Sequence, residues 1–355
     1  MQNVMPLGLS YDDVLLIPQY SEVESRNNVD LFSQISPNIT LDIPIISTNM
    51  TDVTGLEMAI ELAKLGGLGV IPRFQSAEEQ ANLIEKVKKQ NLLVGAAIGI
   101  RNGMYDRLET LIKAGADIFF LDVAHGHMKK VVEATRDIKT RFPKIKLISG
   151  NVATADGAEY LFKSGADGVK VGIGPGSICT TRITTGSGVP QITALLEVAA
   201  VARKYKKTFI ADGGIKNSGD IVKALATGAS AVMLGNMLAG TSESPGKKVK
   251  LEGKWYKVYN ASTSVAEKIN HVKRNGSEFE KHYVRQIEGI ESVVPYKGSL
   301  KNVIESYTAN MRSGFSYSGA SNIKSLWKNA KFIQITAMGK HESGAHDVLV
   351  MPSQK

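Results

Sequence analysis

Short apolar runs recur along the chain at intervals of roughly 20 to 30 residues, and each is followed by a stretch whose apolar residues have helical spacing. Most runs lack the alternation of a half-exposed strand, which indicates strands buried on both faces. Eight such units predict a closed (β/α)8 or TIM barrel in a single domain, residues 1–355. A doubly wound sheet is the alternative, but no switch-point glycine fingerprint accompanies the eight units. The predicted strands are residues 43–47, 67–71, 93–99, 118–123, 146–152, 168–174, 208–212 and 231–235.

The starts of several predicted strands repeat one phrase: LIKAGAD at residues 111–117, LFKSGAD at 161–167 and ALATGAS at 224–230. In each, a glycine able to adopt the left-handed conformation ends a helix, and a strand follows at once. Ser76 followed by Glu79 predicts a capping-box start for another helix. These signals support regular alternation of helices and strands.

A long insertion, about residues 241–298, separates the last predicted barrel strand from the C-terminal part of the chain. Its middle, residues 270–281, is polar and charged. An insertion of this length after a barrel strand usually forms a lid or flap over the site. Residues 333–336 predict one further short strand, with a polar tail after it.

Composition narrows the function classes. The 355 residues are 43% hydrophobic and 22% charged, which is typical of a globular protein. A single cysteine excludes an internal disulfide and fits a reducing compartment. No apolar run reaches the ~18 residues of a membrane span, and the N-terminus lacks signal-peptide features, so we predict a cytoplasmic protein. The net charge of +9 is dispersed, which favours phosphorylated small ligands over nucleic acid or membrane.

The only cysteine, Cys179, lies in the sequence GIGPGSICTTR at residues 172–182, and a second glycine-rich stretch follows at 186–188. A thiol is a strong nucleophile once it ionises. Held between two mobile segments, it can approach a substrate, bond to it and withdraw. The alternative is a small buried hydrophobic residue. The polar, glycine-rich surroundings after a predicted strand favour the nucleophile.

Further polar residues and glycines follow the predicted strands where a barrel enzyme carries its chemistry, at the carboxyl ends. Asn151 ends the fifth strand, the cysteine loop follows the sixth, Asp212 ends the seventh, and Gly235 ends the eighth. Glycine N–H groups after strands seven and eight often cradle a phosphate. Simple turn chemistry is the alternative for any one glycine, but together these residues predict one mouth.

These sequences resemble the IMP dehydrogenase/GMP reductase family over nearly the whole chain. The resemblance implies a (β/α)8 barrel that binds a purine mononucleotide, GMP or IMP, and bonds its cysteine to purine C2 as a thioimidate. It also implies a homotetramer. The matching sequences are YDDV at residues 11–14, DVAHGH at 122–127, GNV at 150–152, the cysteine loop to Gln191, ADGGI at 211–215, SGD at 218–220, GTSESPG at 240–246 and PYKG at 295–298.

Members of the family resolve the adduct in two ways. The dehydrogenase transfers hydride from IMP to NAD+ and hydrolyses the adduct to XMP, using a flap Arg-Tyr pair to activate water. The reductase expels ammonia from GMP and accepts hydride from NADPH, giving IMP.

Three features favour the reductase here. The regulatory CBS module that most dehydrogenases insert after the second strand has no room between residues 74 and 93. His282-Tyr283 stands at the nearest place to the Arg-Tyr pair. Thr181 and Glu288 match the groups with which reductases serve the departing amine.

The resemblance therefore predicts NADPH-dependent reductive deamination of GMP to IMP and ammonia. A CBS-less, NAD+-dependent IMP dehydrogenase is the alternative, favoured by DVAHGH and by HESGAHD at residues 341–347. A catalytically weak nucleotide-binding regulator is the second alternative, because YNASTS at residues 259–264 departs from the family's Tyr-x-Gly-Met-x-Ser loop.

The resemblance also implies a role for individual residues. Asp212 could instead cap a helix, Tyr259 could be a packed aromatic residue, and Glu288 could be a surface turn residue. His125 and His127 have the spacing of metal ligands, but no third ligand is apparent, so we predict no such metal site. The implied residues are Cys179, Thr181 and Glu288 for catalysis; Ser177, Asp212, Gly214, Gly235, Asn236 and Tyr259 for the nucleotide; Asp122, Asn151, Gly172 and Gly174 for the nicotinamide cofactor; and Gly174, Gly176 and Cys179 for a K+ ion.

Overall fold

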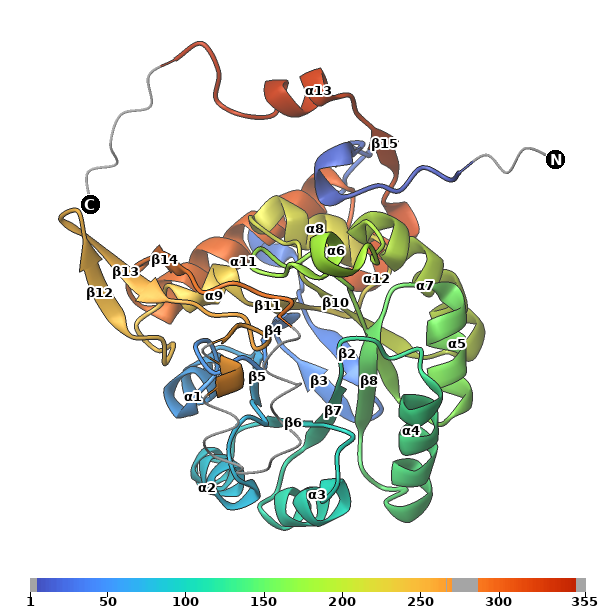
Figure 1. Cartoon of the computed structure of the whole chain (residues 1–355). Helices are drawn as coiled ribbons and strands as arrows, with labels where there is room; N and C mark the ends of the chain where they lie inside the picture. Colours follow the sequence, from blue (N-terminus) through green and yellow to red (C-terminus); the bar gives the residue numbers. More distant parts are fainter. Residues whose placement is uncertain (1–4, 266, 270–286, 349–355) are drawn as a thin grey trace.

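Eight parallel strands form a closed barrel in a computed structural model that describes residues 5–265, 267–269 and 287–348 (Figure 1). Each strand pairs with the next along the chain, and the last pairs with the first. All eight coincide with the predicted apolar runs, so the predicted barrel is confirmed. The strands are β4 (Ile45–Ser47), β5 (Leu68–Ile71), β6 (Gly95–Ile98), β7 (Ile118–Asp122), β8 (Leu147–Val152), β9 (Gly168–Val171), β10 (Thr208–Asp212) and β11 (Ala231–Leu234).

Helices surround the barrel (Figure 1). Ser76 caps the second of them as predicted: its hydroxyl accepts the Glu79 N–H, and the Glu79 carboxylate accepts the Ser76 N–H, both at 3.0 Å. The glycines of the repeated phrase end three helices with φ of +90°, +100° and +112°. The main helices are α1 (Leu56–Lys64), α2 (Ala77–Lys88), α3 (Met104–Lys113), α4 (Lys129–Arg141), α5 (Ala155–Lys163), α7 (Gln191–Tyr205), α8 (Ser218–Ala226) and α11 (Leu300–Tyr317).

Two buried clusters explain why the strand sequences are continuously apolar. Phe120 and Met233 belong to the cluster inside the barrel. Their chain neighbours Phe119 and Val232 belong to the cluster between the strands and the helices. Since successive side chains point to opposite faces, both faces of each strand are buried.

A hairpin of β2 (Ser33–Ser36) and β3 (Ile39–Leu41) closes the amino end of the barrel. Ile35 and Leu41 pack in the interior cluster. Thr208, the first residue of β10, donates its hydroxyl proton to the Ile35 carbonyl at 2.6 Å. The carboxyl end is therefore the open end of the barrel.

Two lysine–aspartate pairs fasten strands at the amino end, and the aspartates are those of the repeated phrase. Lys88 at the end of α2 lies 2.8 Å from Asp117, which also accepts the Val94 N–H at 2.9 Å. Lys139 on α4 lies 2.9 Å from Asp167, and Asp167 accepts the N–H of Leu147, also at 2.9 Å. Each pair ties a helix to the starts of two adjacent strands.

The insertion adds an antiparallel sheet beside the barrel (Figure 1). Its strands are β12 (Lys248–Leu251), β13 (Lys254–Val258) and β14 (Val293–Pro295). The sequence analysis predicted a flap here and missed this sheet. The predicted flap centre, residues 270–281, lies outside the described residues.

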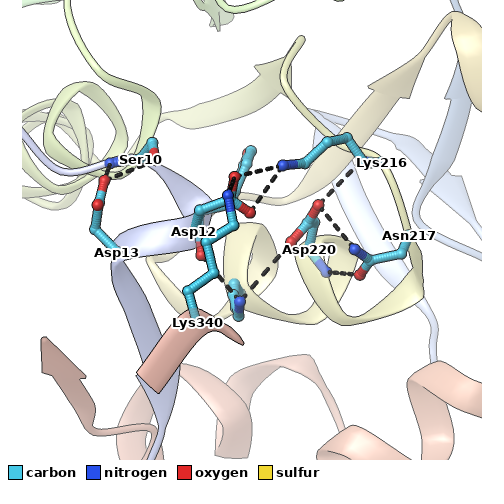
Figure 2. Close-up of polar contacts among 9 residues, drawn as sticks. Ser10, Asp12, Asp13, Lys216, Asn217, Asp220 and Lys340 are labelled. Carbon is cyan, nitrogen blue, oxygen red and sulfur yellow. Dashed lines mark hydrogen bonds and ion pairs between the residues drawn. The ribbon is translucent and has the colours of Figure 1, made fainter. Parts of the chain in front are cut away.

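The two terminal segments meet next to the barrel mouth. β1 (Val14–Leu16) pairs antiparallel with β15 (Phe332–Gln334), so the short C-terminal strand predicted at residues 333–336 is confirmed one residue earlier. Figure 2 shows Asp12 accepting hydrogen bonds from Lys216 at 2.6 Å and Lys340 at 2.7 Å. Lys340 lies on α13 (Ala337–Glu342). Within the described part of the chain, no helix is long and apolar enough to cross a membrane.

Candidate active site

A cavity of about 510 Å³ opens at the carboxyl ends of the barrel strands. The structure brings every residue that the sequence analysis singled out for catalysis, nucleotide or cofactor into its lining. These residues come from β7 to β11, the loops after them and the insertion. His125 and His127 are not part of this lining; their rings lie 6.4 Å apart, edge to face.

Cys179 lies in the loop between β9 and the short helix α6 (Thr181–Thr185). Its thiol is half-buried and free. The sulfur is 3.1 Å from Thr181 Oγ1, which in turn donates to Glu288 Oε2 at 2.7 Å. Because the hydroxyl proton of Thr181 is directed at the carboxylate, the thiol donates in the first contact. The three side chains form a hydrogen-bonded path that can carry a proton between the sulfur and a carboxylate.

Glu288 is distant in sequence, and backbone pairing holds it in place. The Thr180 N–H donates to the Glu288 carbonyl at 2.9 Å, and the Ile290 N–H donates to the Ile178 carbonyl at 3.1 Å. Cys179 and Gly289 form an antiparallel bridge between these bonds. A side chain at Gly289 would collide with Ala261, so close approach requires glycine there. The interpretation of Glu288 as a surface turn residue is therefore wrong.

The loop at residues 259–264 completes this wall. The Tyr259 N–H donates to the Ser292 carbonyl at 2.8 Å, and the Ala261 N–H donates to the Ile290 carbonyl at 3.1 Å. Residues 288–292 therefore lie between the cysteine loop and the 259–264 loop. Backbone hydrogen bonds therefore join the cysteine loop, through residues 288–292, to the loop at residues 259–264 that departs from the family pattern.

Tyr259 packs in the core, as its structural interpretation predicts, but its hydroxyl also belongs to the site. Burial raises its pKa to about 12, against the interaction with Ser177. A side-chain carbon at Gly235 would come within 2.6 Å of the hydroxyl oxygen, so this glycine makes room for the phenol. The neutral hydroxyl is a donor suited to an anion.

The base of the cavity is an ionic network. Asp212 Oδ2 accepts from Lys170 Nζ at 2.6 Å and from Asn151 Nδ2 at 2.9 Å. Lys170 Nζ is also 3.5 Å from Asp122 Oδ1, and Arg73 Nε is 3.4 Å from Asp122 Oδ2. The sequence analysis named both aspartates and Asn151, but it missed both cations. A lysine inside a buried strand was the available signal.

Mutual attraction keeps this network charged. Burial opposes the charge of Lys170, but Asp212 and Asp122 raise its pKa above the ordinary value. Burial likewise opposes ionisation of Asp122, but Lys170 and Arg73 hold its pKa below the ordinary value. Asp212 does not cap the next helix; Asn217 does so, accepting the Asp220 N–H at 2.9 Å. The capping interpretation of Asp212 is therefore wrong.

A (β/α)8 barrel with a cysteine and a hydrogen-bonded path to a carboxylate at its open end has the arrangement of an enzyme active site, and comparison with known proteins gives its family. The family model for the IMP dehydrogenase / GMP reductase domain matches residues 8–346. The chain belongs to this family.

Three relatives are named inosine-5'-monophosphate dehydrogenase. That of Cryptosporidium parvum is 40% identical over 388 residues, which covers 97% of this chain and 96% of the relative. That of Aquifex aeolicus is 37% identical over 473 residues, with 97% and 96% covered. That of Nitrosopumilus maritimus is 35% identical over 473 residues, with 97% and 99% covered.

These relatives overturn the prediction of an NADPH-dependent GMP reductase. Two of the alignments are 473 residues long against 355 residues here, so a chain without extra segments still matches full-length dehydrogenases. The Thr181–Glu288 pair does not discriminate either, because a carboxylate that delivers a proton to an amine also accepts one from water. His282-Tyr283, on which the prediction relied, lies outside the described residues.

Proposed function

We propose that the protein is an IMP dehydrogenase without a CBS module, which oxidises IMP to XMP with NAD+. The observation that carries the proposal is nearly full-length similarity to dehydrogenases together with the unbroken path from Cys179 through Thr181 to Glu288. An unbroken path also favours a catalyst over the nucleotide-binding regulator.

Substrate binding uses the two halves of the cavity lining. Asp212 accepts hydrogen bonds from the ribose hydroxyls, since its carboxylate lines the cavity at the end of β10. The phosphate lies near Tyr259, Ser177 and the backbone of Gly214, Gly235 and Asn236. Gly214 has φ of +79°, a conformation that suits a glycine turn around an anion.

The first chemical step forms a bond between Cys179 and purine C2. The thiol proton leaves along Thr181 toward Glu288, and the resulting thiolate attacks C2. The hydride on C2 departs with the electron pair of the C–H bond, and the electron pair on the adjacent ring nitrogen re-forms the C=N double bond of the adduct. A nicotinamide cofactor bound beside C2 would supply the hydride acceptor.

Residues beside the substrate half fit such a cofactor. Asp122 and Asn151 present a carboxylate and an amide at neighbouring strand ends, and Gly172 and Gly174, both with positive φ, leave that wall without side chains. The backbone carbonyl of Gly176 already accepts the Cys179 N–H at 3.1 Å. The K+ site implied by the resemblance stays a prediction.

The second step consumes water. Glu288 first releases the thiol proton to solvent. Water then attacks C2 of the adduct and passes a proton through Thr181 to Glu288, and the C–S bond breaks. The departing thiolate takes this proton back along the same path, which restores the thiol. The sum is IMP, NAD+ and water giving XMP, NADH and one proton. The expected homotetramer in the cytoplasm stays a prediction that sedimentation and fractionation test.

The test is to incubate the purified protein with IMP plus NAD+, and separately with GMP plus NADPH. Absorbance follows the nicotinamide, and chromatography identifies the purine. We expect NADH and XMP in equal amounts from the first mixture and no ammonia from the second. Nucleotide binding without XMP formation contradicts the proposal.

A further inference from the structure

Lys170 is a buried cation that the proposed reaction leaves without a role. Its side chain is 5% exposed and lies on β9, inside the barrel mouth. Its ammonium is 2.6 Å from Asp212 at the end of β10 and 3.5 Å from Asp122 at the end of β7. One charge thus joins the carboxylate on the nucleotide side to the carboxylate on the cofactor side.

The environment excludes two chemical roles for this amine. A lysine acts as a nucleophile or a general base only when it loses its proton, which requires a lowered pKa. Here the two carboxylates raise the pKa of Lys170 despite burial, so the amine stays an ammonium near neutral pH. It therefore acts through its charge and its hydrogen bonds.

The two carboxylates depend on Lys170 to different degrees. Asp122 has a second cation, Arg73, at 3.4 Å. Among the residues that the structure describes, Lys170 is the cation paired with Asp212, whose other side-chain partner is the neutral amide of Asn151. Removal of Lys170 would leave one partly buried carboxylate, Asp212, with no cation and the other, Asp122, with one.

We propose that Lys170 is a positioning residue that fixes Asp212 toward the nucleotide ribose and Asp122 toward the cofactor, and thereby couples the two subsites. The inference rests on the proposed function, since it takes Asp212 and Asp122 as the groups that face IMP and NAD+. Coupling of this kind is a free energy shared by both ligands.

Lys170→Met tests the proposal, because methionine keeps the length of the side chain without its charge. We expect the dissociation constant of IMP, measured by calorimetry without NAD+ at pH 7.5, to rise roughly 10- to 100-fold, the effect of losing a hydrogen bond to a charged group. Lys139→Met is the matched control at the amino end. Its 2.9 Å pair with Asp167 is far from the cavity, so IMP affinity should not change.

A pH profile separates positioning from mere support of the fold. Four groups surround Asp122. They are Lys170 on β9, Arg73 in the loop after β5, the neutral Asn49 in the loop after β4, and Asp212 on the other side of the Lys170 ammonium. Without Lys170, burial of Asp122 is opposed only by Arg73 and the hydrogen bond from Asn49, so the acid limb of NADH formation should move to higher pH. Lys139→Met should leave this limb unchanged.

Two further variants keep the proposal testable if Lys170→Met does not fold. Lys170→Arg retains the charge and should restore most of the acid limb. The double variant Lys170→Met/Asp212→Asn removes the uncompensated charge, and its acid limb should still be displaced through Asp122. Wild-type protein that binds no IMP overturns the proposed function itself. Wild-type binding with unchanged affinity and acid limb in the folded Lys170 variants overturns only the role of Lys170.

Discussion

Lysine–aspartate pairs occur at both ends of the barrel but have different roles there. At the amino end, Asp117 and Asp167 each hold a lysine and also accept a backbone N–H from an adjacent strand. At the carboxyl end, Asp212 and Asp122 share Lys170, and both line a cavity. A carboxylate held between a lysine and a strand N–H, away from the cavity, contributes to stability. A carboxylate with one side open to a cavity can bind a ligand.

The difference follows from what covers each end. The β2–β3 hairpin closes the amino end with apolar side chains. The carboxyl end is bordered by glycine-rich loops and by residues 288–292 of the insertion. Four substitutions test this division, in order of decreasing effect.

Cys179→Ala should abolish turnover, with a loss of at least ~10³-fold, because no other described side chain in the cavity is a thiol that can form the bond to C2. It removes chemistry from the carboxyl end only, so IMP affinity and the unfolding midpoint should remain close to wild type. NADH absorbance, calorimetry and urea unfolding measure the three quantities. Near-wild-type turnover would falsify the covalent mechanism.

Glu288→Gln should slow steady-state XMP formation on the order of 10²-fold, since the amide cannot take the proton from Thr181. The same carboxylate takes the thiol proton in the first step, so rapid mixing should show NADH formation slowed together with XMP formation. Glu291→Gln, on the same segment but outside the cavity lining, is the control. A burst of NADH at the wild-type rate would contradict the use of Glu288 in the first step.

Lys139→Met should lower the free energy of unfolding by about 2 kcal/mol and leave kcat and KM unchanged. It leaves the buried Asp167 with only the Leu147 N–H. Urea unfolding and steady-state kinetics test the two halves of this prediction. A changed KM would mean that the two ends of the barrel are not independent.

Asp52→Asn should stabilise the protein by about 1 kcal/mol above pH 6, a value reduced for solvent screening of a partly exposed group. Burial, and to a smaller extent Glu267, raise the pKa of Asp52 from 3.8 to about 6 against the hydrogen bond from the Asn260 N–H, so its ionisation opposes folding. The folded state holds this proton more tightly than the unfolded state, so the cost is complete above pH 6 and absent below pH 3.8.

Urea midpoints of Asp52→Asn at pH 4.5 and 7.5 should differ from wild type mainly at the higher pH. Asp30→Asn is the control, because both aspartates accept a backbone N–H at 2.9 Å and Asp30 is exposed. Equal gains at both pH values would exclude ionisation of Asp52 as the cause.

The sequence was sufficient for features that depend on local pattern. The eight apolar runs became the barrel strands, and the glycines of the repeated phrase ended helices. Residues that end strands were located at the correct mouth because parallel strands share their carboxyl ends. The function of each such residue still stays a prediction.

Features that depend on distant partners were missed. A lysine within a strand becomes interpretable only when β7, β9 and β10 bring Lys170 between two carboxylates. The contacts of Asp117 and Asp167 likewise become visible only when the start of the neighbouring strand lies beside each carboxylate. The reductase prediction was wrong because it relied on absences, namely an arginine not found and a module not present, whereas the matching residues were common to both reactions.

The lysine–aspartate pairs at the amino end recur in two of the strand–helix units, as in a repeat protein. Lys88 with Asp117, and Lys139 with Asp167, are the same device placed two strands apart. A third copy of the phrase has Ser230 in the aspartate position, and its N–H still donates to the preceding strand, at Phe209. There Ser33 of the hairpin donates to the Ser230 carbonyl. One position of a recurring two-strand unit therefore has two uses. In two copies its aspartate joins a helix to two strands, and in the third its serine binds the β2–β3 hairpin that closes the barrel.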